Sequence, residues 1–162
     1  MPQRQDYILR LLEELGRFLA EVLKFRRAGS HDAALLTILH AQERLFARPA
    51  AEFMTRPVGE QMHLLALGES GADAREKCLA YATLLAEAGH TYQAREQPAL
   101  AEGAYQVALQ VVRLALQDHP AGDSPEQRDR VLSLIAQLPG DGLKAEIQAL
   151  LGPAGGNGKS PA

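Results

Sequence analysis

The first 48 residues alternate apolar and charged positions with the period of an α-helix. From Tyr7 to Phe25 an apolar residue recurs every three or four positions, with arginine, lysine and glutamate between them. The pair Gly29–Ser30 ends this pattern. A second helical pattern follows, with an expected core face of Leu35, Ile38, Leu39, Ala41 and Leu45. Because the connection is short, we expect the two helices, about 5–28 and 32–48, to form an antiparallel pair.

The rest of the chain continues in helical patterns that proline and glycine divide. Residues 49–57 are expected to be irregular or a short turn of helix. Pro98 and Pro125 suit the first turn of a helix, and Ser124 and Gln127 suit a capping box. No stretch of strand length alternates apolar and polar residues. The remaining expected helices are about 58–68, 72–96, 98–118, 124–138 and 141–151.

These patterns predict an all-α single domain of about six or seven helices over residues 1–151, packed as antiparallel hairpins. The Gly/Pro-rich segment 152–162 has no core residues and is expected to be disordered. The segment Val107–Leu116 is apolar nearly all round. Such a helix is either central in the domain, which is the simpler interpretation, or covered by a second copy in a homodimer.

Two of the predicted helix pairs share one spacing of small and large residues. Phe25 precedes Ala34, Ile38 and Ala41 by the same intervals at which a second aromatic residue, Tyr92, precedes three residues of the later pair. Small residues at matched heights let two helices approach closely. The residues expected to pack the later hairpin are Gly89, Tyr92, Ala101, Tyr105 and Ala108.

Over roughly residues 82–113 this later pair resembles a tetratricopeptide-repeat (TPR) hairpin. Its five packing residues stand on positions of the family pattern, whereas Arg113 replaces the closing proline, so the helix runs on. The resemblance implies a helical scaffold that binds proteins or peptides, with the first helix of each hairpin lining the inner face. Carried onto this chain, it places Thr83, Ala86, His90, Gln93, Arg26 and Arg27 on that face as candidate partner-binding residues.

Composition narrows the classes of partner and compartment. The 162 residues carry a formal net charge of −3, which does not demand a nucleic-acid partner. Residues 1–57 hold nine Lys/Arg against seven Asp/Glu, so weak nucleic-acid binding through N-terminal arginines stays an alternative. Cys78 is the only cysteine, and neither a signal peptide nor an apolar run of membrane-spanning length stands out. We therefore expect a cytoplasmic protein without a membrane partner.

A metal site is the main chemical alternative. Glu60 and His63, and likewise Glu87 and His90, stand three apart, so each pair shares one helix face and could bind a metal ion. Di-iron helical bundles use two such motifs together with glutamates from two further helices. Only residues 64–86 separate the motifs here, which leaves no place for one of those helices.

Other catalytic motifs are incomplete. The sequence around Lys159 ends like a phosphate-binding loop but lacks the first glycine at the required position, and no strand precedes it. Cys78 lies in a helical pattern without a catalytic signature around it, as a buried structural thiol would. The sequence therefore favours a non-catalytic scaffold, without a cofactor, that mediates protein–protein interaction or self-association.

Overall fold

The computed structural model describes residues 2–119 and 124–152, and within these ranges all regular structure is helical. The prediction of an all-α domain is confirmed. The described residues form eight helices rather than six or seven, because residues 50–54 form a short helix of their own. Of the segment predicted to be disordered, all but Gly152 lies outside the described residues. The helices are α1 (Pro2–Arg27), α2 (His31–Phe46), α3 (Ala50–Met54), α4 (Val58–Ala66), α5 (Gly71–Ala94), α6 (Pro98–Asp118), α7 (Pro125–Ala136) and α8 (Asp141–Leu151).

The hairpins α1/α2 and α5/α6 close through turns of the same geometry. The amide of Ser30 donates to the Phe25 carbonyl over 2.9 Å, and the amide of Gln97 donates to the Tyr92 carbonyl over the same distance. The residue before each donor has a positive φ, so each first helix ends in a Schellman motif. Phe25 and Tyr92, which the sequence pairs by spacing, therefore occupy equivalent positions at the two turns.

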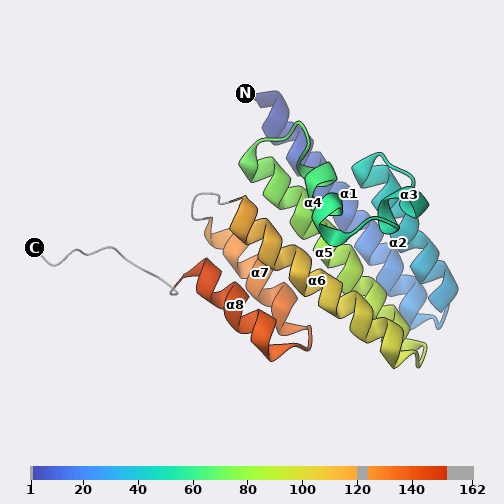
Figure 1. Cartoon of the computed structure of the whole chain (residues 1–162). Coiled ribbons are helices and arrows are strands. Elements are labelled where there is room, and N and C mark those ends of the chain that lie inside the picture. Colours follow the sequence, from blue (N-terminus) through green and yellow to red (C-terminus); the bar gives the residue numbers. More distant parts are fainter. Residues whose placement is uncertain (1, 120–123, 153–162) are drawn as a thin grey trace, which may run out of the picture.

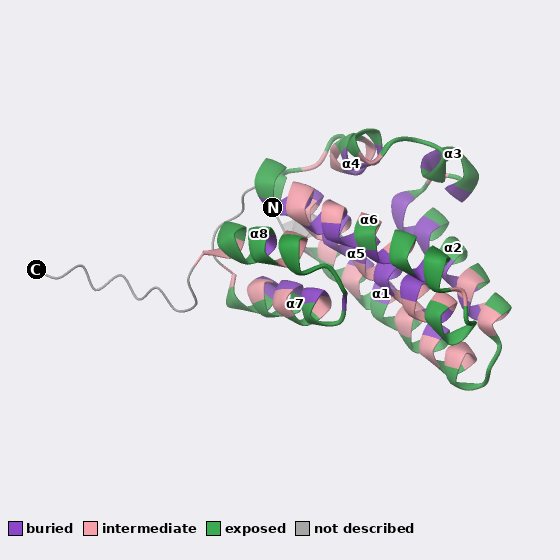
Figure 2. Ribbon diagram, turned by 60° about the horizontal axis from the view of Figure 1, so that its bottom comes forward, coloured by how far each residue is buried: buried purple, intermediate pink, exposed green. Residues whose placement is uncertain are grey.

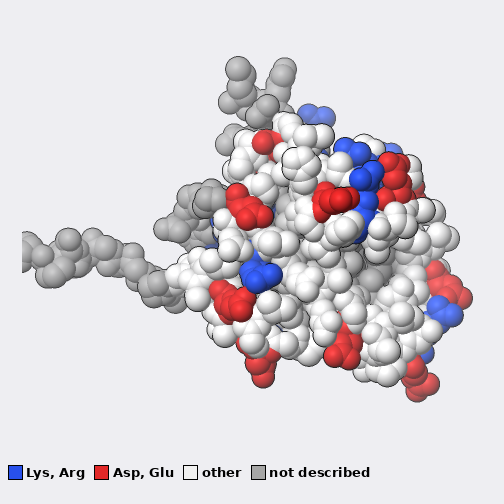
Figure 3. All heavy atoms as spheres, in the orientation of Figure 1, with Lys and Arg blue, Asp and Glu red and all other residues white. Residues whose placement is uncertain are grey.

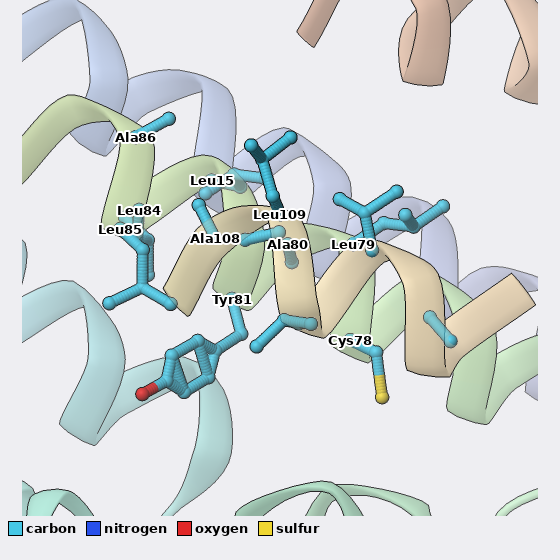
Figure 4. Packing of buried hydrophobic residues seen from close by; sticks show 14 of the residues in the cluster. Leu15, Cys78, Leu79, Ala80, Tyr81, Leu84, Leu85, Ala86, Ala108 and Leu109 are labelled. Carbon is cyan, nitrogen blue, oxygen red and sulfur yellow. The ribbon is translucent and has the colours of Figure 1, made fainter. Parts of the chain in front are cut away.

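The α5/α6 hairpin is the most extensive helix pair of the fold, and small residues lie at its interface (Figure 1). Ala101 and Ala108 have no exposed surface, and Tyr105 lies over Gly89. A Cβ atom added to Gly89 would come within 2.6 Å of Tyr105 Cδ1. Ala80 and Ala108 belong to the cluster of buried residues drawn in Figure 4. The α1/α2 hairpin buries its matched residues in the same way, at Val22, Ala34, Ile38 and Ala41.

An aromatic cluster and one buried amide attach α3 and α4 to α5. The rings of Phe46, Phe53 and Tyr81 lie with centroids 5.1–6.2 Å apart. Gln61 donates to the carbonyls of Phe53 and Arg56 over 3.1 Å, and its side-chain oxygen accepts the Tyr81 hydroxyl over 2.9 Å. Burial raises the pKa of Tyr81 above its ordinary value, since the phenolate would lose its hydration. The helices α3 and α4 are therefore attached to α5 by hydrogen bonds that lie inside an apolar cluster.

The segment Val107–Leu116 has no exposed residue among its ten, because α4, α5 and α8 all pack against α6. This apolar segment is covered within the chain, so it offers no free face for a homodimer contact. One residue of the predicted core lies elsewhere: Leu39 is 40% exposed. The face of α2 that contacts α1 and α5 carries Ile38, Ala41 and Leu45, and Leu39 lies to one side of that face.

A third hairpin, α7/α8, completes the arrangement. In Figure 2 α3 and α4 lie on one side of α5 and α6, and α1 and α7 lie on the other side. Eleven of the 24 residues of α5 are buried, and Figure 2 shows α5 within the helical arrangement. The third hairpin attaches to α6 mainly through α8. As a result α7 contacts α5 only narrowly and does not close against α1.

The contact between Gly89 and Tyr105 gives a direct test of the hairpin. Replacing Gly89 with alanine is expected to destabilise the protein by about 1–3 kcal/mol, because the ring of Tyr105 must shift or the helices must separate. Chemical denaturation with circular dichroism measures this free energy. The matched control is Gly103→Ala in the same hairpin, where an added Cβ meets nothing within 4 Å. That change should stabilise the protein by about 0.5–1 kcal/mol through helix propensity. Equal effects of the two substitutions would contradict the packing.

Candidate functional site: a groove between three helices

An open groove of 1210 Å³ runs along α5, with α1 as one wall and α7 as the other. The floor is formed by small and medium side chains of α5, which include Ala72, Ala80 and Thr83. The groove exists because α8, and not α7, makes the main contact with α6, so α7 lies away from α1. The helices α1 and α7, which form its walls, can be followed in Figure 2.

The α1 wall is apolar and only partly covered. Ile8, Leu12 and Leu19 line the groove half-buried, and Leu9 is 57% exposed. By contrast, the neighbouring Leu15 is 7% exposed. A large apolar side chain left in contact with water loses the free energy that burial would provide. The α1 wall is therefore an unpartnered apolar face of the molecule.

The α7 wall is polar and is tied to α5 at one end by Glu76. The carboxylate of Glu76 accepts two hydrogen bonds from Arg130, at 2.6 and 3.0 Å, and one from the Gln127 side chain at 2.8 Å. Ser124 caps α7 as predicted, accepting the Gln127 amide over 3.3 Å. The Gln127 side chain does not return to complete a capping box, because it is used in the bond to Glu76. A charged pair with two parallel bonds fixes orientation as well as distance.

His90 ties the other end of the groove. Its Nε2 lies 3.3 Å from Gln137 Oε1, beyond the end of α7, and its Nδ1 lies 2.8 Å from the Tyr105 hydroxyl. An amide oxygen only accepts, so this geometry places the His90 proton on Nε2, and Nδ1 accepts from Tyr105. Burial raises the pKa of Tyr105, an effect that Arg26 opposes and Glu87 reinforces. One histidine therefore links α5 to both α6 and the end of α7.

The candidate partner-binding residues divide into three groups in the structure. Thr83 lines the groove, whereas Gln93 and Arg27 are exposed near the ends of their helices. His90 is occupied by Tyr105 and Gln137, as described above. Arg26 is held by Glu87 over 2.7 Å, with less than a fifth of its side chain exposed.

The prediction that Ala86 lies on the inner surface is wrong. It was placed there with Thr83, but it is 1% exposed and belongs to the core. The face of α5 that lines the groove instead passes through Glu76, Leu79, Ala80 and Thr83 to Glu87. The rotation of α5 follows from its contacts with α1, α2 and α6, which bury the side that Ala86 occupies.

The groove also contains residues that the sequence does not single out. Ile8, Leu12 and Leu19 belong to the helical pattern of apolar residues between Tyr7 and Phe25, in which Leu11, Leu15 and Val22 form the buried side. The sequence signal for an uncovered apolar side of α1 is the width of its apolar face, which exceeds what packing against one helix requires. The polar wall of α7 gave no comparable signal, because Glu76 and Arg130 are ordinary helix-surface residues far apart in sequence.

The residues of the metal alternative do not form a common site. Glu60 and His63 are exposed on α4, where Arg56 lies 3.6 Å from Glu60. The side chains of Glu87 and His90 are held by Arg26 and by Tyr105 and Gln137. In the described parts of the chain no three His, Cys, Asp or Glu residues gather as metal ligands would. The two motifs therefore fit helix-surface and helix-tie roles.

Some arginines of the N-terminal part are paired with carboxylates. Arg44 pairs with Glu14 at 3.2 Å, and Arg56 lies 3.7 Å from Glu52. In the view of Figure 3 acidic and basic atoms are interspersed over a mostly uncharged surface. Neutralised and scattered cations give little of the electrostatic term on which nucleic-acid binding depends. None of the described helices has the length and apolar character to cross a membrane.

Cys78 is a core residue rather than a nucleophile. Its side chain has no exposed surface, and burial raises the pKa of its thiol to about 12, against a smaller opposing effect of Lys77. The thiolate is the reactive form of cysteine, and it is scarcely populated at neutral pH under this condition. Chemistry at this position would require the helices around it to open.

Comparison with protein-family models, with curated proteins and with solved structures finds no match for this chain.

The tie at Glu76 predicts how α7 is held. Glu76→Ala removes the acceptor for Arg130 and Gln127, and we expect a loss of about 1–3 kcal/mol, the range for charged hydrogen bonds. Amide hydrogen exchange should accelerate most in α7, since α7 has few other contacts with the domain. The matched control is Glu102→Ala on α6, which is exposed and forms no ion pair with another described residue. Uniform acceleration over all helices, or none in α7, would contradict this role of Glu76.

Proposed function

We propose that the protein is a non-catalytic helical scaffold that binds a protein partner in the groove between α1, α5 and α7. The observation that carries this proposal is the α1 wall, where Ile8, Leu12 and Leu19 stay half-buried and Leu9 is exposed beside a 1210 Å³ hollow. An uncovered apolar face next to a polar wall is typical of protein-interaction sites. Three of the ionisable residues that line it, Glu76, Glu87 and Arg130, are engaged in ties between helices, which supports a role in binding.

The likeness to TPR hairpins supports the same function. The α1/α2 and α5/α6 hairpins share turn geometry and matched buried residues, and the first helix of each hairpin lines the groove. A third hairpin, α7/α8, follows and brings the number of stacked units to the three that repeat proteins generally need. It departs from regular stacking because α8 provides the main contact with α6. We infer a TPR-like arrangement whose last unit is displaced, which widens the groove.

The proposal also concerns the compartment of the protein and its self-association. We infer a cytoplasmic scaffold, because a chain with Cys78 as its single cysteine cannot form the intrachain disulfides that are typical of proteins in oxidising compartments. Leu36 and Leu39 are 52% and 40% exposed on α2 and supply a second, smaller apolar surface. Contact between two copies through α2 is compatible with a free groove, since α2 does not line it.

Blocking the groove tests the proposal. Gly16 lines it, is exposed, and has nothing within 4 Å of an added Cβ, so Gly16→Trp should fill the groove without disturbing the fold. The probe is a phage-displayed library of peptides of about 16 residues, selected on the full chain. Selected peptides should lose about tenfold or more in affinity on Gly16→Trp. Gly103→Trp is the matched control: this glycine is also helical, exposed and open, but lies on α6 away from the groove.

The two variants separate the outcomes clearly. Loss of binding on Gly16→Trp with retention on Gly103→Trp supports the groove as the binding site. Equal binding to both variants, or the absence of any selected peptide, would overturn it. Circular dichroism melting of both variants shows that they fold like the wild-type chain.

A further inference from the structure

We infer that the groove takes an amphipathic helix with one apolar face and one basic face, the basic face lying along α7. This inference rests on the proposed function and specifies the chemistry of the partner. Three observations carry it: the shape of the groove, the contrast between its two walls, and its charge.

The shape suits a helix. The floor runs along α5 from Ala72 to Glu87, which is about 22 Å at the rise of an α-helix and matches an occupant of about 15 residues. The α1 wall presents Ile8, Leu12, Leu15 and Leu19, one helical face whose ridges can interlock with those of another helix. The small side chains of the floor, Ala72, Ala80 and Thr83, leave room for close approach. A bound helix would lie beside α5 with a wall on each side.

The walls differ in polarity, and this fixes how such a helix would be oriented. The α1 side is apolar, whereas α7 presents mostly polar residues to the groove, Glu126, Asp129, Arg130, Ser133 and Gln137, together with the buried Val131 and the half-buried Leu134. An occupant that is apolar all round would leave the polar wall without hydrogen-bond partners, which costs free energy. An amphipathic helix satisfies both walls at once, with its apolar stripe on α1 and its polar side on α7.

The charge of the groove is acidic. Five carboxylates line it, at Asp73, Glu76, Glu87, Glu126 and Asp129, against the single cation Arg130. Glu76 is neutralised by Arg130, and Glu87 by Arg26 from α1. The other three form no ion pair within the described residues, and Glu126 and Asp129 are exposed. Complementary charge on a partner would steer its approach and select it over acidic competitors.

Helix stability explains part of this acidity but not all of it. Asp73 and Glu126 lie in the first turns of α5 and α7, where a carboxylate interacts favourably with free amides. Asp129 lies beyond the first turn of α7, so that explanation does not reach it. Whatever their contribution to the helices, all three add negative charge to the α7 side and to the adjacent end of the floor. Lysine or arginine on the occupant is the chemistry that matches them.

The same peptide selection tests this inference with a different readout. The library contains helix-forming peptides of about 16 residues with equal shares of Lys and Glu at the polar positions. Groove-dependent clones, defined as those that Gly16→Trp rejects, should carry an excess of Lys over Glu. On the double variant Glu126→Lys/Asp129→Lys their affinity should fall about tenfold at low salt, and the loss should shrink as salt is added. The control is Glu102→Lys/Asp141→Lys, two exposed carboxylates on α6 and α8 outside the groove.

Each result decides something distinct. Lys-rich clones that respond to the α7 variant and not to the control support the basic amphipathic helix. Groove-dependent clones that are neutral or acidic, or that ignore the α7 charges, overturn this inference and leave the proposed function standing. Groove-dependent clones rich in proline would overturn the helical form of the occupant. If no clone depends on Gly16, the proposed function and this inference fall together.

Discussion

The contact of Tyr105 with Gly89 is the interaction on which the arrangement of this protein depends. Because Gly89 has no side chain, the Tyr105 ring can lie against α5 and α6 can approach closely. The ring then carries its hydroxyl to His90, and His90 reaches Gln137 at the end of α7. The absence of a side chain at Gly89 therefore positions the α5/α6 hairpin, the hydrogen bonds of His90 and one end of the groove wall. A larger residue at position 89 would disturb all three together.

A balance between strong and weak attachments gives the groove its form. The α5/α6 pair is closely packed, and α8 attaches the last hairpin to α6. The helix α7 is left with narrow contacts on α5 and α8 and with polar ties at Glu76, at His90 and from Arg128 to the Leu151 carbonyl. The displaced third hairpin is thus both the irregular part of the architecture and the origin of its main concave surface.

The helices and their pairing could be predicted from sequence because the responsible signals are local. Pro98 and the small residues Gly89, Ala101 and Ala108 lie within one hairpin and encode its turn and its close approach. The groove could not be predicted in the same way. Its ties join residues more than forty positions apart, such as Glu76 with Arg130 and His90 with Gln137, and these residue types are common on any helix surface. The prediction for Ala86 was wrong for a related reason, because the rotation of α5 about its axis depends on several neighbouring helices at once.

The most direct test of this account is a nuclear Overhauser spectrum of the full chain in solution. The account predicts strong contacts between the α protons of Gly89 and the ring protons of Tyr105, with those α protons shifted upfield by the ring. It also predicts contacts between the His90 ring and the Gln137 side chain in the same spectrum. Gly89 α protons at ordinary shifts without contacts to Tyr105 would contradict the central claim, because the close approach of α5 and α6 would then be absent.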